Sequence, residues 1–177
     1  MSYSGEHILL SSQREGQISR FPAWVMLVVP LAAILFQVYV PLFFEFLSFL
    51  EMPLLVVVYF ALMRRSQVGG LLLGALVGLA QDSLSKNPLG MLGIVNTLVG
   101  YFAASVGLRL DVDHPLIRLL LAFFFFLFHQ FFYWLLAHAL LGQQVAFEVQ
   151  RTLVLGLLNA VVGVALFHFL DKLRKAA

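Results

Sequence analysis

This chain of 177 residues is too apolar for a soluble domain. Hydrophobic residues make up 62% of it and charged residues 11%, against about 25% charged in soluble globular domains. The net charge of +2 comes from short clusters in loops and tails, and no basic stripe exists that could bind nucleic acid. Cysteine is absent, which excludes thiol and disulfide chemistry. Length and composition predict one compact all-α membrane domain.

Hydrophobic runs long enough to cross a bilayer divide the chain. Residues 1–20 are polar, and we expect a cytosolic tail. The next apolar run is too long for a signal-peptide h-region and has no small-residue cleavage site. We interpret residues 21–171 as a six-helix membrane domain and residues 172–177 as a basic cytosolic tail. The predicted spans are residues 22–44, 46–63, 67–84, 89–107, 116–141 and 147–170.

Polar residues mark the first two spans. Gln37 in the first is expected to form a hydrogen bond between helices. In the second span, Glu51 and Pro53 allow two interpretations of where the helix begins. A helix that begins near Phe46 has Glu51 facing protein or water, whereas one that begins at Glu51 is short for a full crossing. We interpret Glu51 as an interfacial acid, with a functional role as the alternative.

The third span carries glycines at a four-residue spacing and ends in an acid. Gly70, Gly74, Gly78 and Asp82 fall near one helical face, and glycine lets a neighbouring helix come close. The segment that follows breaks the helix and re-enters the membrane. Its marked residues are Ser85, Pro88 and Gly90.

The fourth span presents a second small-residue face. Gly93, Asn96, Gly100, Ala104 and Gly107 recur with helical periodicity. We expect the third and fourth spans to pack closely across the tight turn, with Asn96 as a polar contact. Packing alone is sufficient to explain the glycines.

Aromatic residues dominate the fifth span. Its histidines, His129 and His138, are nine residues apart, whereas helical metal ligands need a spacing of three or four, so we expect no metal site. At the start of the sixth span, Glu148 and Arg151 are spaced to form an ion pair. This span has a third small-residue face: Gly156, Asn159, Ala160 and Gly163.

Positive charge predicts the orientation. With the amino terminus in the cytosol, the cytosolic segments carry nine of the eleven Lys and Arg residues, and the outer segments carry Lys86 and Arg151. This bias favours six spans with both termini in the cytosol. Asp82 and Ser85 then lie near the outer face.

No catalytic or cofactor-binding motif is found. The chain lacks G-x-S-x-G, H-E-x-x-H and a P-loop, and we expect neither an enzyme nor a cofactor. Asp82 could relay protons, because acids in membranes are costly and often functional. Its place near an interface, with no second acid in its helix, favours a structural or partner-contact role.

The stretch around Asp82 resembles the MreD family of bacterial rod-shape-determining membrane proteins. The resemblance rests on Arg64-Arg65, the glycine-spaced helix that ends in Asp82, Ser85, the turn Pro88-Leu89-Gly90, and Gly100-Tyr101. The specific match covers residues 55–107. The other spans match in hydrophobicity.

The resemblance implies a non-enzymatic scaffold of the cell-elongation complex in the inner membrane. Such proteins bind MreC, a single-span protein with a periplasmic domain. Through MreC they connect to a transpeptidase of the penicillin-binding class, to RodA and to cytosolic MreB.

The family's fold is similar to the substrate-binding S-component of energy-coupling-factor vitamin transporters, which supplies an alternative function. S-components use an A-x-x-x-A face on the first span. Ala23, Ala32 and Ala33 do not provide that spacing, although an outward-opening ligand pocket would favour transport.

Overall fold

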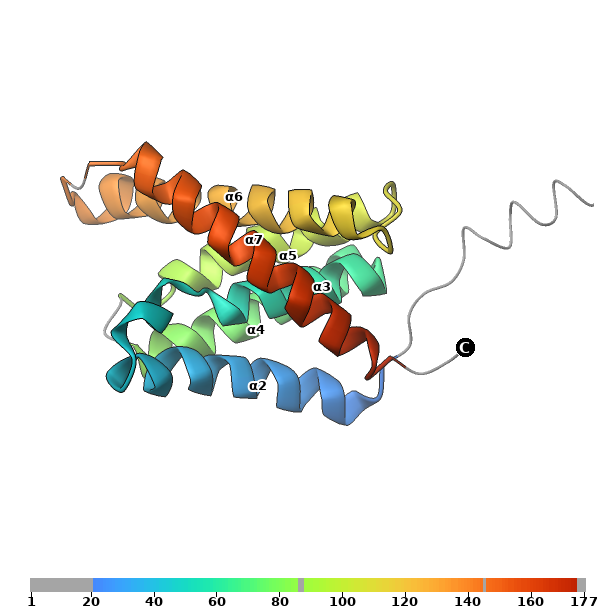
Figure 1. The fold of residues 1–177 in the computed structure, drawn as a ribbon. Helices are drawn as coiled ribbons and strands as arrows, with labels where there is room; N and C mark the ends of the chain where they lie inside the picture. Colours follow the sequence, from blue (N-terminus) through green and yellow to red (C-terminus); the bar gives the residue numbers. More distant parts are fainter. Residues whose placement is uncertain (1–20, 86–87, 145, 175–177) are drawn as a thin grey trace, which may run out of the picture.

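The computed structural model describes residues 21–85, 88–144 and 146–174. This part of the chain folds into six α-helices that run in alternating directions (Figure 1). Five segments are long and apolar enough to cross a membrane, and α5 is a shorter apolar helix. The elements are α2 (Ala23–Tyr39), η1 (Val40–Leu42), η2 (Glu45–Phe49), α3 (Met52–Arg64), α4 (Gln67–Leu84), α5 (Met91–Gly107), α6 (Pro115–Leu141) and α7 (Val149–Asp171).

The predicted spans correspond to these helices, with differences at the first two. The first span is α-helical only as far as Tyr39, and Pro41 lies in the short η1 that follows. The second span is broken, because η2 precedes α3 and Glu51 stands directly before the α-helix. The short form of this helix, with 13 residues, is therefore the one observed. The predicted tail of residues 1–20 lies outside the described residues.

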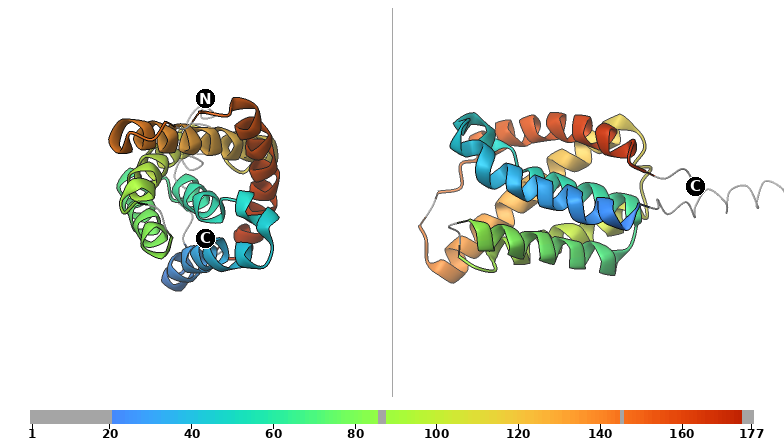
Figure 2. Two further views of the ribbon diagram at one scale, coloured as in Figure 1. Left: turned by 90° about the vertical axis from the view of Figure 1, so that its left-hand side faces the viewer. Right: turned by 90° about the horizontal axis from the view of Figure 1, so that it is seen from below.

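Helix α3 forms the centre of the bundle. Viewed along the bundle, the other helices surround it (Figure 2), and every residue from Pro53 to Met63 is buried. A helix that is apolar on all sides can be buried on all sides. Because α3 is enclosed by protein, its 13 residues need not span a full bilayer by themselves.

Helices α4 and α5 are pressed together along their glycines, as the sequence predicted. A methyl carbon built on Gly70 would lie 2.3 Å from the carbonyl oxygen of Gly100, and one on Gly74 would lie 2.0 Å from that of Asn96. The same position on Gly78 is 2.3 Å from the carbonyl oxygen of Leu92. These contacts are with main chain, which cannot move aside as a flexible side chain can. A side chain at any of these positions would separate the helices.

The two ends of the bundle differ. We call the end that carries Phe21 and Lys172 the terminal end, and the end that carries η1, η2, the 85–90 turn and the 142–148 loop the cavity end (Figure 1). Because the helices alternate in direction, both ends of the described chain lie at the terminal end. The remaining features of interest are at these two ends.

Candidate functional site: an acidic cavity at one end of the bundle

The Asp82 carboxylate caps the neighbouring helix. Its Oδ2 accepts hydrogen bonds from the backbone N–H groups of Gly90 (2.9 Å) and Gly93 (3.1 Å), and its Oδ1 accepts one from Leu92 (3.2 Å). The first N–H groups of an α-helix have no partner within the helix, and the helix dipole there favours negative charge. Asp82 at the end of α4 therefore supplies the cap that α5 lacks, since Gly90 has no side chain to do so.

The turn between α4 and α5 depends on glycine. Gly90 has a φ of 98°, in the left-handed region where a side chain is unfavourable. This conformation directs the N–H of Gly90 to Asp82. Pro88 contributes its carbonyl oxygen to a 3.4 Å hydrogen bond from the N–H of Met91. Four predicted residues, Asp82, Ser85, Pro88 and Gly90, thus lie together at one corner of the bundle.

The donors nearest to Asp82 in sequence, and its expected partners, are the side chains of Ser85, Asn87 and Asn96 and the backbone N–H groups after Pro88. The backbone groups bind the carboxylate, whereas the side chains of Ser85 and Asn96 do not. The Ser85 hydroxyl donates to the main-chain oxygen of Asp82 (3.4 Å) and not to its carboxylate. Asn96 is fully buried, but neither atom of its side-chain amide has a hydrogen-bond partner in the structure described. The expected polar contact of the Asn96 side chain is therefore not found among the described residues, and what packs against α4 at this position is the main-chain carbonyl of Asn96, beside Gly74. Asn87 lies outside the described residues.

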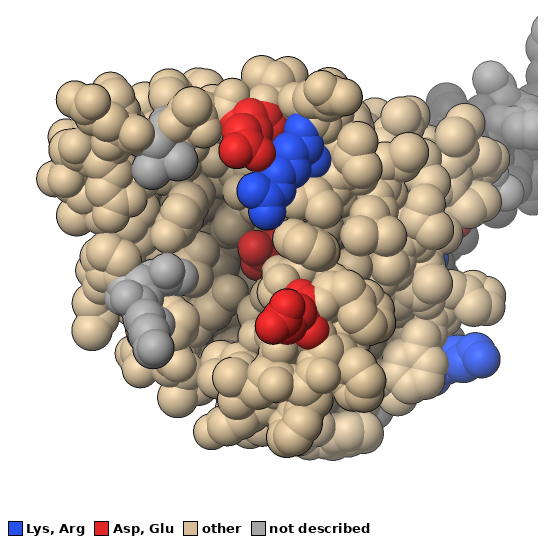
Figure 3. All heavy atoms as spheres, turned by 60° about the vertical axis from the view of Figure 1, so that its left-hand side comes forward, with Lys and Arg blue, Asp and Glu red and all other residues tan. Residues whose placement is uncertain are grey.

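A cavity of about 530 Å³ opens beside this corner. Figure 3 shows the hollow in the surface, with acidic atoms recessed inside it. Residues from α2, α4, α5 and α6, from η1 and from the chain next to α3 and α4 line it: Gln37, Val38, Leu42, Glu51, Gln81, Leu84, Ser85, Leu92, His129, Gln130 and Tyr133. We call it the main cavity. A side cavity of about 360 Å³ between α6, α7 and η2 shares Glu51, Gln130 and Tyr133 with it.

The chain at Glu51 is held by side chains from two other helices. The N–H of Glu51 donates to Oδ1 of Asn159 in α7 (2.8 Å), and the Nδ2 of Asn159 donates to the carbonyl oxygen of Phe49 (2.8 Å). The N–H of Met52 donates to Oε1 of Gln37 in α2 (3.2 Å). Gln37 therefore forms the interhelical hydrogen bond expected of it. These bonds fix where the Glu51 carboxylate enters the cavity.

Several polar groups in the main cavity have no partner in the described part of the chain. The carboxylate of Glu51 accepts no hydrogen bond and forms no ion pair there, although Glu51 precedes α3. His129 is 3% exposed, and its Nδ1 is unpartnered. Buried polar groups in proteins are normally paired. A cavity lined by such groups is therefore suited to a polar occupant.

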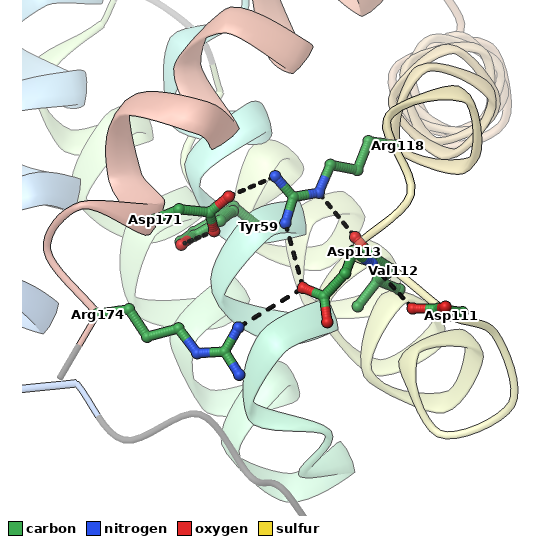
Figure 4. Close-up of polar contacts among 7 residues, drawn as sticks. All are labelled: Tyr59, Asp111, Val112, Asp113, Arg118, Asp171 and Arg174. Carbon is green, nitrogen blue, oxygen red and sulfur yellow. Dashed lines mark hydrogen bonds and ion pairs between the residues drawn. The ribbon is translucent and has the colours of Figure 1, made fainter. Parts of the chain in front are cut away.

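At the terminal end, in contrast, Arg118 and Arg174 are paired with acids (Figure 4). Arg118, buried at the start of α6, contacts the carboxylates of Asp171 and Asp113 and donates from Nε to the carbonyl oxygen of Val112 (2.7 Å). Asp171 also accepts a hydrogen bond from the hydroxyl of Tyr59 (2.8 Å), and Arg174 lies 3.5 Å from Asp113. This network ties α3, α6 and α7 together.

Comparison with protein families decides which class of protein this is. Residues 19–176 match the model of the rod shape-determining protein MreD. The chain belongs to the MreD family. It is thus an all-α, multi-pass membrane protein of a family that determines rod shape, and that family is described as shape-determining, not as enzymatic. Comparison with curated proteins and with solved structures gives no match.

The sequence did not predict the cavity, although it singled out some of its residues. Gln37, Glu51 and His129 stood out as polar residues within apolar spans, but Gln81, directly before Asp82, was overlooked. The signal available was that Gln37 and Gln81 lie near the carboxyl ends of α2 and α4 and Glu51 lies before the amino end of α3, which in an alternating bundle is the same side. The predicted Glu148–Arg151 pair is confirmed at 3.4 Å on the rim of the side cavity.

Proposed function

We propose that this chain is a non-enzymatic scaffold of the cell-elongation complex and that its cavity end docks MreC. Family membership supports the role in rod-shape determination. The observation that carries the docking proposal is the main cavity, whose lining includes the Glu51 carboxylate and the Nδ1 of His129, two groups without a partner among the described residues. In the orientation proposed below, the extracytoplasmic segment of a single-span partner leaves the membrane on the same side as this end of the bundle. We propose that this segment occupies the main cavity.

The distribution of charge supports an orientation in the inner membrane. Within the described residues, the terminal end carries Arg64, Arg65, Arg109, Arg118, Lys172 and Arg174, whereas the cavity end carries Arg151. Because positive charge favours the cytosolic side, we propose that both termini are cytosolic and that the cavity faces the periplasm. MreC would then link periplasmic synthesis by RodA and the transpeptidase to MreB filaments in the cytosol.

Cysteine labelling tests this orientation, and the chain contains no native cysteine to interfere. Cysteine introduced by Asn87→Cys should react with an impermeant thiol reagent added outside the cell. Cysteine introduced by Ser66→Cys should react only after the membrane is permeabilised. The opposite pattern would contradict the proposed orientation.

Filling the cavity tests MreC docking. Gln130→Trp places a large side chain where both cavities meet, whereas Leu135→Trp places the same side chain on an exposed part of the same helix. With the purified chain and full-length MreC of the same genome in nanodiscs, Gln130→Trp should weaken binding by about tenfold or more, as expected for a blocked central pocket. Leu135→Trp should bind like the unmodified chain. Equal binding by both variants would contradict docking in the cavity.

The cavity also favours one other function, that of a vitamin-binding S-component. Native mass spectrometry of the purified chain would distinguish it from a scaffold. A small molecule bound in a one-to-one ratio, and lost in Gln130→Trp, would support vitamin binding. Its absence, together with MreC binding, would support the scaffold.

A further inference from the structure

The Glu51 carboxylate differs from the other buried or half-buried acids that the structure describes. Asp82 is bound by backbone N–H groups, and Asp171 by Arg118 and Tyr59. Glu148 pairs with Arg151 at the rim. Glu51 lines both cavities, yet its carboxylate has no donor or cation from the described residues. A recessed carboxylate without a partner is costly in a membrane protein unless another molecule donates hydrogen bonds to it or neutralises its charge.

The position of this carboxylate is fixed by the fold. The N–H of Glu51 donates to Oδ1 of Asn159 and the N–H of Met52 donates to Oε1 of Gln37, so the main chain is held at both residues. The preceding η2 and the following α3 leave Glu51 at a junction where the chain cannot easily rotate the acid away. The positive end of the α3 dipole lowers the cost of the charge, but the side chain makes no capping hydrogen bond there.

Among the Lys and Arg residues that the structure describes, Arg151 is the one at the cavity end, and it is already engaged. It lines the side cavity with Glu51, but its guanidinium pairs with Glu148 at 3.4 Å and lies over the ring of Phe49 at 5.8 Å. Its side chain is 60% exposed. Arg151 therefore belongs to the rim, and the recessed acid is left for an occupant.

The neighbours of Glu51 in the main cavity are suited to a cation with several donors. Gln81 and Gln130 offer amide oxygens, and neither side chain has a hydrogen bond within the described residues. His129 presents an unpartnered Nδ1. A guanidinium has five N–H donors and an ammonium has three, so one basic side chain could satisfy the carboxylate and one or two of these neutral acceptors together.

We propose that the segment docked in the main cavity inserts a lysine or arginine side chain that pairs with Glu51. This inference rests on the proposed function, because it takes MreC as the source of that segment. Charge complementarity of this kind fixes the register of a docked chain and excludes segments without a base at the right position. The cavity thus selects a partner segment that has a basic side chain at one specific position.

A double-mutant cycle with full-length MreC of the same genome tests the pairing. Glu51→Gln keeps the shape of the side chain and removes its charge, and Glu148→Gln does the same at the rim. We expect Glu51→Gln to weaken binding by about tenfold or more, as for a buried interfacial charge pair, and Glu148→Gln to change it by no more than about twofold, as for an exposed pair. Glu51→Asp, which keeps the charge, should retain most of the binding.

The second arm of the cycle identifies the base. Each lysine and arginine in the extracytoplasmic segment of MreC next to its span is changed in turn to methionine. One of these changes should weaken binding to the unmodified chain and have no further effect with Glu51→Gln, since the pair is then already broken.

The outcomes separate this inference from the docking proposal. If Gln130→Trp blocks MreC while Glu51→Gln binds normally, docking holds and the pairing is overturned. If Glu51→Gln weakens binding but every change in MreC is additive with it, the base does not come from that segment and the inference is again overturned. If MreC does not bind the unmodified chain at all, both fall. Melting temperatures measured without MreC show whether each variant is folded.

Discussion

Asp82 and Glu51 are two acids at the same end of one helix bundle, and they differ in the hydrogen-bond partners of their carboxylates. Asp82 follows Gln81, which lines the same cavity as Glu51. Asp82 is 2% exposed and receives three backbone hydrogen bonds. Glu51 receives none in the described part of the chain, and the bonds around it bind its main chain instead. The fold thus supplies hydrogen-bond donors to the carboxylate of Asp82, whereas the described residues supply none to that of Glu51.

The difference separates a structural acid from one available to a partner. An acid whose donors come from its own chain contributes to folding, and removing it leaves those donors buried and unpaired. An acid held rigidly over a cavity without donors contributes nothing of this kind. Its removal should affect binding and not folding. Substitutions in the helix pair that carries Asp82, and then at each acid, test this separation of a structural acid from an acid available to a partner.

The close contact of α4 and α5 should be the least tolerant feature of the molecule. In Gly78→Leu the first side-chain carbon alone would lie 2.3 Å from the carbonyl oxygen of Leu92. Overpacking usually costs about 1–3 kcal/mol, and the cost here should be larger because the obstacle is main chain. We expect no folded protein in detergent by size-exclusion chromatography. Leu76→Phe, on the exposed face of the same helix, is the control and should fold.

Asp82→Leu should be the next most damaging change. It leaves the N–H groups of Gly90, Leu92 and Gly93 without their acceptor, and each buried unpaired donor costs about 1–3 kcal/mol. The melting temperature and MreC binding should fall together. A variant that melts normally would contradict the structural role.

Asp82→Asn gives an intermediate case that the sequence alone did not predict. The amide keeps one acceptor oxygen and turns an N–H₂ group toward a backbone donor. The structural role that the sequence favours for Asp82 implies that asparagine, which keeps the shape of the side chain, is tolerated. The three donors around Asp82 indicate instead a partial loss, of about 1–2 kcal/mol for one unmet hydrogen bond. If the acid relayed protons, the asparagine variant would fail in function while folding normally.

At the terminal end, Arg118→Met should cost less than Asp82→Leu. Arg118 is buried, and breaking a fully buried ion pair costs about 3–5 kcal/mol. However, the side chains of Asp171 and Asp113 are 28% and 62% exposed and can be solvated by water. We therefore expect a loss of about 1–2 kcal/mol, near the value for hydrogen bonds to charged groups, measured by thermal unfolding. Arg109→Met, on an exposed residue of the neighbouring loop, should leave stability unchanged.

Much of the fold, and one part of the site, could be predicted from the sequence. The α4–α5 contact and the Asp82 cap are encoded within a short stretch, because a four-residue glycine period defines a face and a proline-glycine turn brings the next helix directly back. Asp82 binds N–H groups at most 11 residues away. Local spacing therefore predicted both features.

The cavity could not be predicted in the same way. Glu51, Gln81 and His129 come from different helices, and whether they converge depends on how each helix is rotated and how deep it lies. Apart from the hydroxyl of Tyr59, residues 52–63 are apolar, with no polar face that sets their rotation. Their central burial and the break before them follow from the packing of the whole bundle.

Glu51→Gln should have the smallest effect on stability, and this result would distinguish the two acids most directly. The change removes a recessed charge that no described residue neutralises and breaks no hydrogen bond of the fold. Replacing an unpaired buried charge by a neutral group of the same shape is neutral or stabilising. Without MreC, the melting temperature should therefore stay the same or rise, whereas Asp82→Asn, the same chemical change at the neighbouring acid, should lower it. If Glu51→Gln also lowers the melting temperature, Glu51 has a structural partner, and the division between the two acids is wrong.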